Sequence, residues 1–175
     1  INGFRQSGNP YSYTYRGDMS GYRTDGENIE ILYIPKVNDP NVLYGDDFDA
    51  AAFEQFLSDS GLSAYRGSVV PRNSFNGPWE GTFDLRIAQE IPSGNIAGKA
   101  IIYFDIENVL NLLNSDWGGF ENYNGGGTTN TRGIVEAEVD DQGRYIYNKF
   151  KVSDQNPIQK IDKSVWQIKV GVKYQ

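Results

Sequence analysis

Hydrophobic and polar residues alternate most regularly in Ser164–Gln175, at the C-terminal end of the chain. One face of an extended strand there carries Trp166, Ile168, Val170, Val172 and Tyr174. The residues between them are polar or glycine, which gives a period of two. An apolar face with an aromatic residue at each end is typical of a strand that crosses a membrane within a β-barrel. The same alternation also fits a strand that packs one face on the core of a soluble protein.

Three further segments alternate in the same way, namely Ile1–Arg16, Gly81–Ile91 and Ala97–Asn108. In the second and third of them, the apolar side chains that we assign to the lipid-facing side are Phe83, Leu85, Ile87, Ile102, Phe104 and Ile106. The turn Pro92–Asn95 between these two segments predicts a β-hairpin. Together with the last segment, the pattern predicts four spanning strands.

Three tyrosines share one face of the first segment. Tyr11, Tyr13 and Tyr15 alternate there with small and polar residues. Aromatic side chains gather at the two interfaces of a membrane, so these residues predict part of an interfacial girdle. The alternative is an exposed row of tyrosines on a soluble sheet.

The connections between these strands differ greatly in length. Two are long, Gly17–Glu80 and Asn111–Lys163, whereas the hairpin turn is short. Outer-membrane barrels have short turns on one side and long extracellular loops on the other. The first long connection predicts one helix, Asp46–Ser60, whose apolar stripe we expect to pack onto its own loop. The second predicts a small polar hairpin from Ile134–Val139 and Arg144–Val152.

Composition narrows the function classes. The net charge of −7 argues against a nucleic-acid partner, because phosphate contacts need an excess of Lys and Arg. The absence of Cys and His removes disulfides and most ligands of transition metals. The chain begins with Ile1 and shows no leader, which indicates a mature product or a fragment. No repeat or linker divides it, so we expect residues 1–175 to form one domain.

Candidate chemistry is sparse, and we expect no enzyme. Asp105 and Glu107 resemble a catalytic carboxylate pair, but no base, metal or nucleophile accompanies them. We interpret them as part of a lattice of ion pairs facing a wet lumen. Asp18, Asp25 and Asn28, in the loop after the first strand, are candidate Ca²⁺ ligands without a known ligand spacing. A solvated turn is the alternative, and no other cofactor is expected.

Aromatic residues outside the strands are candidate binding residues. They are Phe75, Trp79, Trp117 and Phe120, all in the predicted loops. Loops carry most binding residues of proteins. Packing within the loops is the alternative interpretation.

Five motifs occur in a fixed order along the chain. They are SGNPYSYTY, ILYIP, VVPRNSFNGPWEGTFDLRIAQEIP, IIYFDIENVLNLLNSDWG and SVWQIKVGVKY. As an ordered set they resemble the C-terminal end of a TonB-dependent outer-membrane receptor of the Oar-like type, over nearly the whole chain. Such receptors usually end in an aromatic residue, whereas this sequence ends in Gln175.

The resemblance implies an all-β fold, an antiparallel transmembrane barrel of about 22 strands with an N-terminal plug. This chain would supply the last four strands and long extracellular loops carrying the helix and the small hairpin. The implied function is substrate transport across the outer membrane of a Gram-negative bacterium, coupled to TonB through the N-terminal part. The implied partners are outer-membrane lipid and lipopolysaccharide, the rest of the barrel, and the plug. The alternative is a soluble, secreted β-sandwich binding module.

Overall fold

Strands dominate the fold, which is all-β as the sequence predicts. The computed structural model describes residues 1–21, 30–92, 98–122, 130–152, 158–159 and 164–174. The chain divides into two compact units. The sheet unit comprises Ile1–Gly8, Pro78–Glu121 and Gln159–Gln175. The core unit comprises Asn9–Gly77 and Asn122–Ile158.

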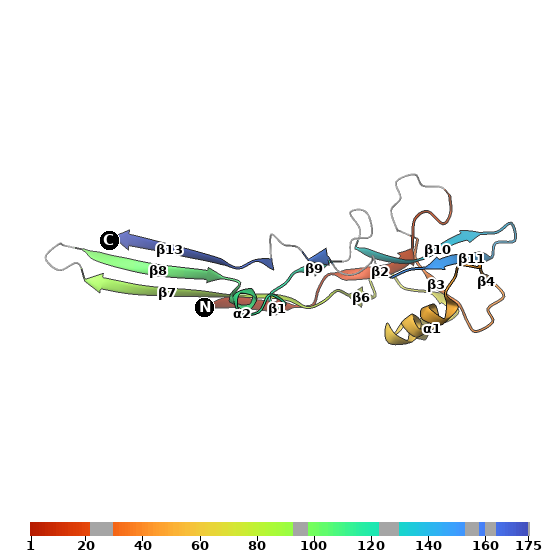
Figure 1. Cartoon of the computed structure of the whole chain (residues 1–175), viewed down its shortest axis with the longest axis horizontal. Helices are drawn as coiled ribbons and strands as arrows, with labels where there is room; N and C mark the ends of the chain where they lie inside the picture. The colour runs from red at the N-terminus through yellow and green to blue at the C-terminus, as the bar shows by residue number, and fades with distance from the viewer. Residues whose placement is uncertain (22–29, 93–97, 123–129, 153–157, 160–163, 175) are drawn as a thin grey trace. The chain divides into compact units, whose positions relative to one another are not determined.

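The sheet unit is built on one antiparallel sheet of four strands in the order β1-β7-β8-β13 (Figure 1). Its strands are β1 (Asn2–Gln6), β7 (Glu80–Pro92), β8 (Lys99–Glu107) and β13 (Gln167–Tyr174). The short helix α2 (Val109–Leu113) follows β8. The unit also contains parts of β9 (Glu121–Asn122) and β12 (Ile158–Gln159), which pair with each other.

Three of the four predicted spanning segments are confirmed as strands of this sheet. β7 and β8 pair as the predicted hairpin, and β13 pairs with β8 along its whole length. Of the predicted turn, residues 93–95 lie outside the described residues. In an antiparallel sheet of this order, the connections β1 to β7 and β8 to β13 leave from the same end. The long connections therefore share one end of the sheet, as expected, and the short one has the other.

The prediction of a single strand over Ile1–Arg16 is wrong. The segment forms β1 in the sheet unit and β2 (Pro10–Tyr15) in the core unit. Gly8 and Pro10 interrupt it, since glycine weakens a strand and proline has no N–H for the ladder. Only the short β1 remains in the four-stranded sheet.

The two long connections fold together in the core unit. Its sheet has the order β4-β11-β10-β2-β6, in which β10 pairs parallel with β2 and β11 pairs parallel with β4. The strands are β2, β4 (Val42–Tyr44), β6 (Phe75–Asn76), β10 (Thr131–Val139) and β11 (Tyr145–Phe150). A smaller sheet pairs β3 (Tyr33–Ile34) with β5 (Ser68–Val69). β10 and β11 confirm the predicted small hairpin. β4 and β6 come from the first connection, and β2 comes from the predicted first strand.

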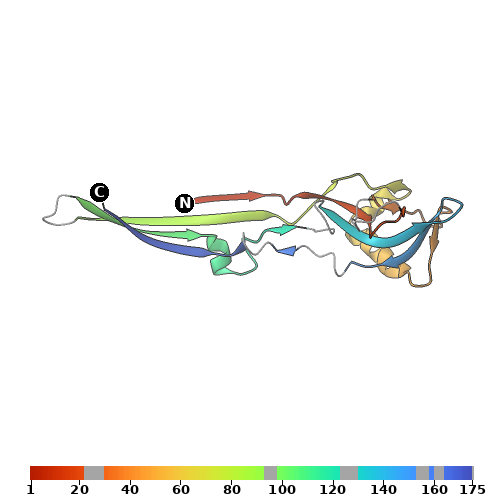
Figure 2. The same ribbon diagram turned by 90° about the horizontal axis from the view of Figure 1, so that it is seen from above.

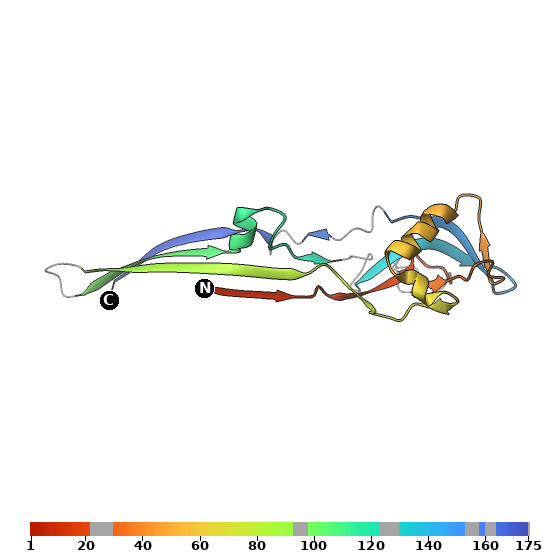
Figure 3. The same ribbon diagram turned by 90° about the horizontal axis from the view of Figure 1, so that it is seen from below.

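The predicted helix is confirmed as α1 (Ala50–Asp59), although its predicted start at Asp46 is wrong. Asp49 caps the helix, and its carboxylate accepts the Ala52 N–H at 2.9 Å. A short 3₁₀ helix, η1 (Leu62–Tyr65), follows. Figures 2 and 3 show α1 lying against the sheet of the core unit. Phe53 of α1 packs on Phe150 of β11, with ring centroids 5.3 Å apart. Phe53 also packs on Phe48 of its own loop, as expected, with ring centroids 5.3 Å apart. The contact with β11 shows that the helix packs on the other connection as well.

The core of the protein lies entirely in the core unit among the described residues. The predicted tyrosine girdle is wrong, because Tyr11, Tyr13 and Tyr15 are each at most 5% exposed. The alternative of an exposed row of tyrosines fails for the same reason. The Tyr15 and Tyr147 hydroxyl oxygens lie 3.1 Å apart, and burial raises the pKa of both groups. Both phenols therefore stay neutral, which lets them hydrogen-bond to each other inside an apolar core.

The division into two units explains why no linker is visible in the sequence. The chain passes between them at Gly8–Asn9, Gly77–Pro78, Glu121–Asn122 and Ile158–Gln159. Each unit is thus assembled from segments that are distant in sequence, and a linear scan for a boundary finds none. Among the described residues, no helix is long and apolar enough to cross a membrane.

Candidate functional site

One face of the four-stranded sheet is almost entirely apolar. Residues directly opposite each other in an antiparallel pair point to the same face. The register therefore defines four rows across β7, β8 and β13: Leu85, Ile106 and Ile168; Ile87, Phe104 and Val170; Gln89, Ile102 and Val172; Ile91, Ala100 and Tyr174. All but Gln89 are apolar. We call these twelve residues the apolar face.

The apolar face is open to its surroundings. Val170 and Val172 are 63% and 69% exposed, and Ile87 is 53% exposed. None of the twelve residues is buried. The sequence assigned nine of them, together with their neighbours Phe83 and Trp166, to a lipid-facing side, and the register brings these nine residues to one face. Exposed apolar patches of this extent are rare on soluble monomers and mark a surface that something else covers.

The opposite face is polar and cross-linked by ion pairs. Arg86 of β7 lies 3.4 Å from Asp105 of β8, between the Arg86 Nε and Asp105 Oδ1 atoms. Lys99 lies 3.2 Å from Glu90, and Lys169 pairs with Glu107. The lattice of ion pairs predicted for these strands is present. Asp105 and Glu107 are the two carboxylates compared above with a catalytic pair. Each forms an ion pair with a cationic side chain on a neighbouring strand.

A glycine on this polar face makes room for a tyrosine. Gly171 of β13 lies opposite Tyr103 of β8, and a Cβ atom on Gly171 would overlap the Tyr103 ring. The Arg86 guanidinium lies 4.8 Å from the centroid of the same ring. The glycine therefore lets the ring lie flat across the neighbouring strand, where it also contacts a cation.

Two of the predicted binding aromatics meet in a hollow within the sheet unit. Trp79 and Trp117 both line it, 63% and 51% exposed, and its volume is about 340 Å³. Phe4, Arg5, Leu110, Asp116 and Glu121 also line it. The Arg5 guanidinium lies 4.9 Å from the centroid of the Trp79 ring. We call this site the aromatic hollow.

The other two predicted aromatics lie elsewhere. Phe120 packs on Phe4, with ring centroids 6.1 Å apart. Phe75 belongs to the core unit and packs on Tyr13, with ring centroids 4.8 Å apart. Phe75 also packs on Tyr65 of its own connection, with ring centroids 6.1 Å apart, so it packs both within its loop and on β2.

The loop that carries Trp117 is held by side-chain hydrogen bonds. Asn108 is 3% exposed, and its Nδ2 donates to the carbonyl oxygens of Gly118 and Ser164 at 2.9 and 3.0 Å. The Ser164 Oγ accepts the N–H of Phe120 at 3.0 Å. Asn108 also donates its own N–H to Asp84 at 2.9 Å. Sequence reasoning missed Asn108 and Ser164, because single polar residues beside a strand carry no pattern.

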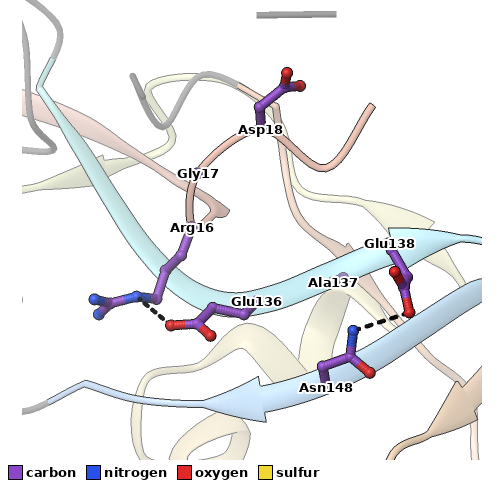
Figure 4. Close-up of a pocket in the computed structure, with 7 residues that line it drawn as sticks. All are labelled: Arg16, Gly17, Asp18, Glu136, Ala137, Glu138 and Asn148. Carbon is purple, nitrogen blue, oxygen red and sulfur yellow. Dashed lines mark hydrogen bonds and ion pairs between the residues drawn. The ribbon is translucent and has the colours of Figure 1, made fainter. Parts of the chain in front are cut away.

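A second, wider hollow lies in the core unit (Figure 4), with a volume of about 600 Å³. Its lining includes Asp18, Glu136 and Glu138. Arg16 pairs with Glu136 at 3.5 Å, and Asn148 donates to Glu138 at 3.3 Å. The carboxylates do not converge, since Figure 4 shows that of Asp18 directed away from the other two.

The predicted calcium site rests on residues of which only one is described. Asp18 accepts a hydrogen bond from Ser20 Oγ at 2.9 Å, whereas Asp25 and Asn28 lie outside the described residues. Across the ranges that the structure describes, no group of three or more acidic residues could hold a metal ion. The calcium expectation gains no support from the described part of the loop.

Comparisons with known proteins give no match. No family model matches the chain, and no curated protein and no solved structure is significantly similar to it.

Proposed function

We propose that the chain is the C-terminal part of an outer-membrane transport receptor of the TonB-dependent, Oar-like type. In this proposal β1, β7, β8 and β13 are the last strands of a barrel of about 22 strands. The observation that carries the proposal is the two-sided sheet, with an exposed apolar face and an ion-paired polar face. The apolar face meets lipid, and the polar face lines a wet lumen.

The dimensions of the strands suit a bilayer. β8 has nine residues and is therefore about 30 Å long. At a tilt of about 40° it rises about 23 Å, close to the apolar band of about 25 Å on such barrels. Trp166 and Tyr174 stand at opposite ends of the apolar side of the last strand, where interfacial aromatics belong.

The open edges of the sheet support a larger barrel. Within the described parts of the chain, β13 has a paired strand on one side only, and β1 covers β7 only from Glu80 to Asp84. Unpaired backbone groups along the edge of an apolar strand promote aggregation, and closure of a barrel removes such edges. In our proposal the rest of the barrel pairs with both edges, the plug fills its lumen, and TonB couples transport through the N-terminal part.

The core unit then forms the extracellular side. Both long connections leave the sheet at one end, and together they build the core unit. In our proposal this end faces outward, beside lipopolysaccharide, in the outer membrane of a Gram-negative bacterium. The role of this chain is to close the barrel wall and present the outer loops, without catalysis.

Dispersion of the purified chain tests the proposal. We expect it to need detergent or lipid, because the apolar face has no cover within the described residues. Size-exclusion chromatography with and without detergent provides the measurement. A folded, monodisperse monomer in plain buffer would eliminate the membrane proposal.

One observation favours the alternative of a soluble binding module. The described residues of the core unit include fourteen buried apolar residues that form one core, as a water-soluble module needs. A soluble β-sandwich would, however, also bury Val170 and Val172 against a second sheet. Both are among the most exposed apolar side chains described, so we favour the membrane proposal.

A further inference from the structure

We propose that the aromatic hollow binds a sugar ring of an uncharged glycan. The inference does not depend on the membrane proposal, because every residue of the hollow lies within the sheet unit. The hollow uses none of the twelve residues of the apolar face. Its aromatic surface therefore needs an explanation of its own.

Two indole rings provide the stacking surface. Trp79 and Trp117 are each more than half exposed, although the hydrophobic effect favours burial of so large a ring. Arg5 stacks on the Trp79 ring and helps to orient it. A volume of about 340 Å³ lies at the lower end of the range for small-molecule sites. One or two sugar rings fit this size.

The polar groups of the hollow favour an uncharged, hydroxylated ligand. Asp116 and Glu121 would repel an anion, and Arg5 would repel a second cation beside Trp79. A purely apolar ligand would displace water from these charged groups and offer them no hydrogen bond in return. A sugar ring satisfies both demands, since its C–H faces stack on the indoles while its hydroxyls hydrogen-bond to carboxylates and guanidinium.

The backbone around Trp117 is fixed before any ligand arrives. Asn111 Nδ2 donates to the carbonyl oxygens of Ser115 and Trp117 at 3.0 and 3.1 Å. Asn108 holds the next carbonyl, that of Gly118, at 2.9 Å. Gly118 has a positive φ of 65°, and a Cβ atom there would overlap the Asn108 side chain. Such fixation lowers the entropy cost of binding, which suits a recognition loop.

An uncharged glycan can come from two sources, a free oligosaccharide or the uncharged sugars of lipopolysaccharide. The experiment uses the complete chain, folded in detergent, and isothermal titration calorimetry. One arm uses maltohexaose, cellohexaose and chitohexaose, and the other uses purified lipopolysaccharide. We expect at least one arm to show millimolar or tighter binding, and the arm that binds identifies the source.

Substitutions then locate the binding. Trp79→Ala and Trp117→Ala should each weaken it about tenfold or more, as for exposed tryptophans that anchor a ligand. Trp166→Ala is the matched control, because Trp166 is 46% exposed in the same unit and does not line the hollow. Trp117→Phe should retain most of the affinity, which separates loss of the ring from loss of the fold.

Three results would overturn the inference. The first is the absence of binding in both arms. The second is a loss of glycan affinity in Trp166→Ala as large as that in Trp79→Ala and Trp117→Ala. The third is Trp79-dependent binding of a cationic peptide in place of any glycan. Failure of the membrane proposal is distinguishable. A chain that folds in plain buffer would be titrated there, and the glycan result would stand by itself.

Discussion

The two units of this protein use apolar residues in opposite ways. The core unit hides its large side chains, so that Phe53, Leu57 and Tyr147 have no exposed surface. The sheet unit leaves Val170 and Val172 more than 60% exposed, and its buried side chains among the described residues are polar: Glu80, Asn108 and Ser164. The core unit is stabilised by its own packing, whereas the sheet unit needs a cover that the described chain does not provide.

Spectroscopy can follow each unit separately. All three Trp lie within the ranges of the sheet unit, and ten of the twelve Tyr lie within those of the core unit. Tryptophan fluorescence therefore reports on the sheet unit, and near-UV circular dichroism of tyrosine reports mainly on the core unit. The predictions below use this difference.

The largest expected effect is at the centre of the core unit. Phe53→Ala should lower the free energy of unfolding by about 3–5 kcal/mol, because it leaves a cavity among Phe48, Tyr147 and Phe150. Urea titration followed by tyrosine near-UV circular dichroism measures it. Phe104→Ala is the control, since Phe104 is 44% exposed on the apolar face and leaves no enclosed cavity. Equal losses of unfolding free energy in Phe53→Ala and Phe104→Ala would contradict the contrast between a buried core in one unit and an open apolar face in the other.

A charge on the apolar face should have the next largest effect. Val170→Lys should destabilise the protein in lipid vesicles by about 2–4 kcal/mol, because the side chain would face hydrocarbon at mid-height. Urea titration with tryptophan fluorescence provides the measurement. Gln167→Lys, on the polar face of the same strand, should be close to neutral. If Val170→Lys lost no stability, the apolar face would not meet lipid.

A smaller effect concerns the Gly171–Tyr103 pair on the polar face. Gly171→Ala should cost about 1–3 kcal/mol, because the added methyl group displaces the Tyr103 ring. In a Tyr103→Ala background the same change should be neutral or stabilising by up to about 1 kcal/mol, since alanine suits a strand better than glycine. A double-mutant cycle in lipid measures the coupling. Additive effects would show that the ring does not depend on the glycine.

The smallest expected effect is a pH dependence of the core unit. Hydrogen bonds from the Lys36 N–H and the Tyr33 hydroxyl, at 3.0 and 2.7 Å, hold the pKa of Asp39 below its usual value. The Asp39 carboxyl group therefore binds its proton more tightly in the unfolded chain than in the folded one. The stabilisation is complete above about pH 4 and is lost as the pH falls through the lower folded pKa.

Asp39→Asn should remove this part of the acid sensitivity. We expect the melting temperature of the variant to fall less than that of the wild type between about pH 5 and pH 2, by a difference below about 4 °C. Thermal scans followed by tyrosine near-UV circular dichroism compare the two proteins. Parallel losses in both would exclude Asp39 as a source of the acid sensitivity.

Sequence patterns predicted the structure correctly where it depends on residues that are neighbours within one strand or helix. The alternation in β7, β8 and β13 placed the hairpin, the apolar face and the ion-paired face correctly. The apolar stripe from Phe48 to Leu57 identified α1 but not its N-terminus, because the helix begins at Ala50, with Asp49 as its cap, and not at Asp46. Within the candidate site, exposed Trp79 and Trp117 were recognised, but not that they line one hollow. Asn108 and Ser164 were missed because their hydrogen-bond partners lie far away in sequence.

The sequence alone therefore determined the local elements of the protein, because a period of two and a capped amphipathic stripe are properties of adjacent residues. Only the tertiary structure decided which elements share a core. Tyr11, Tyr13 and Tyr15 have the pattern of an interfacial girdle, yet they are buried because β10 pairs with β2 and aromatic side chains of β6, α1 and β11 pack on them. Pairing between strands more than a hundred residues apart leaves no local pattern in the sequence. Segments with the same alternation of apolar and polar residues can therefore form a buried sheet in one unit and an open sheet in the other.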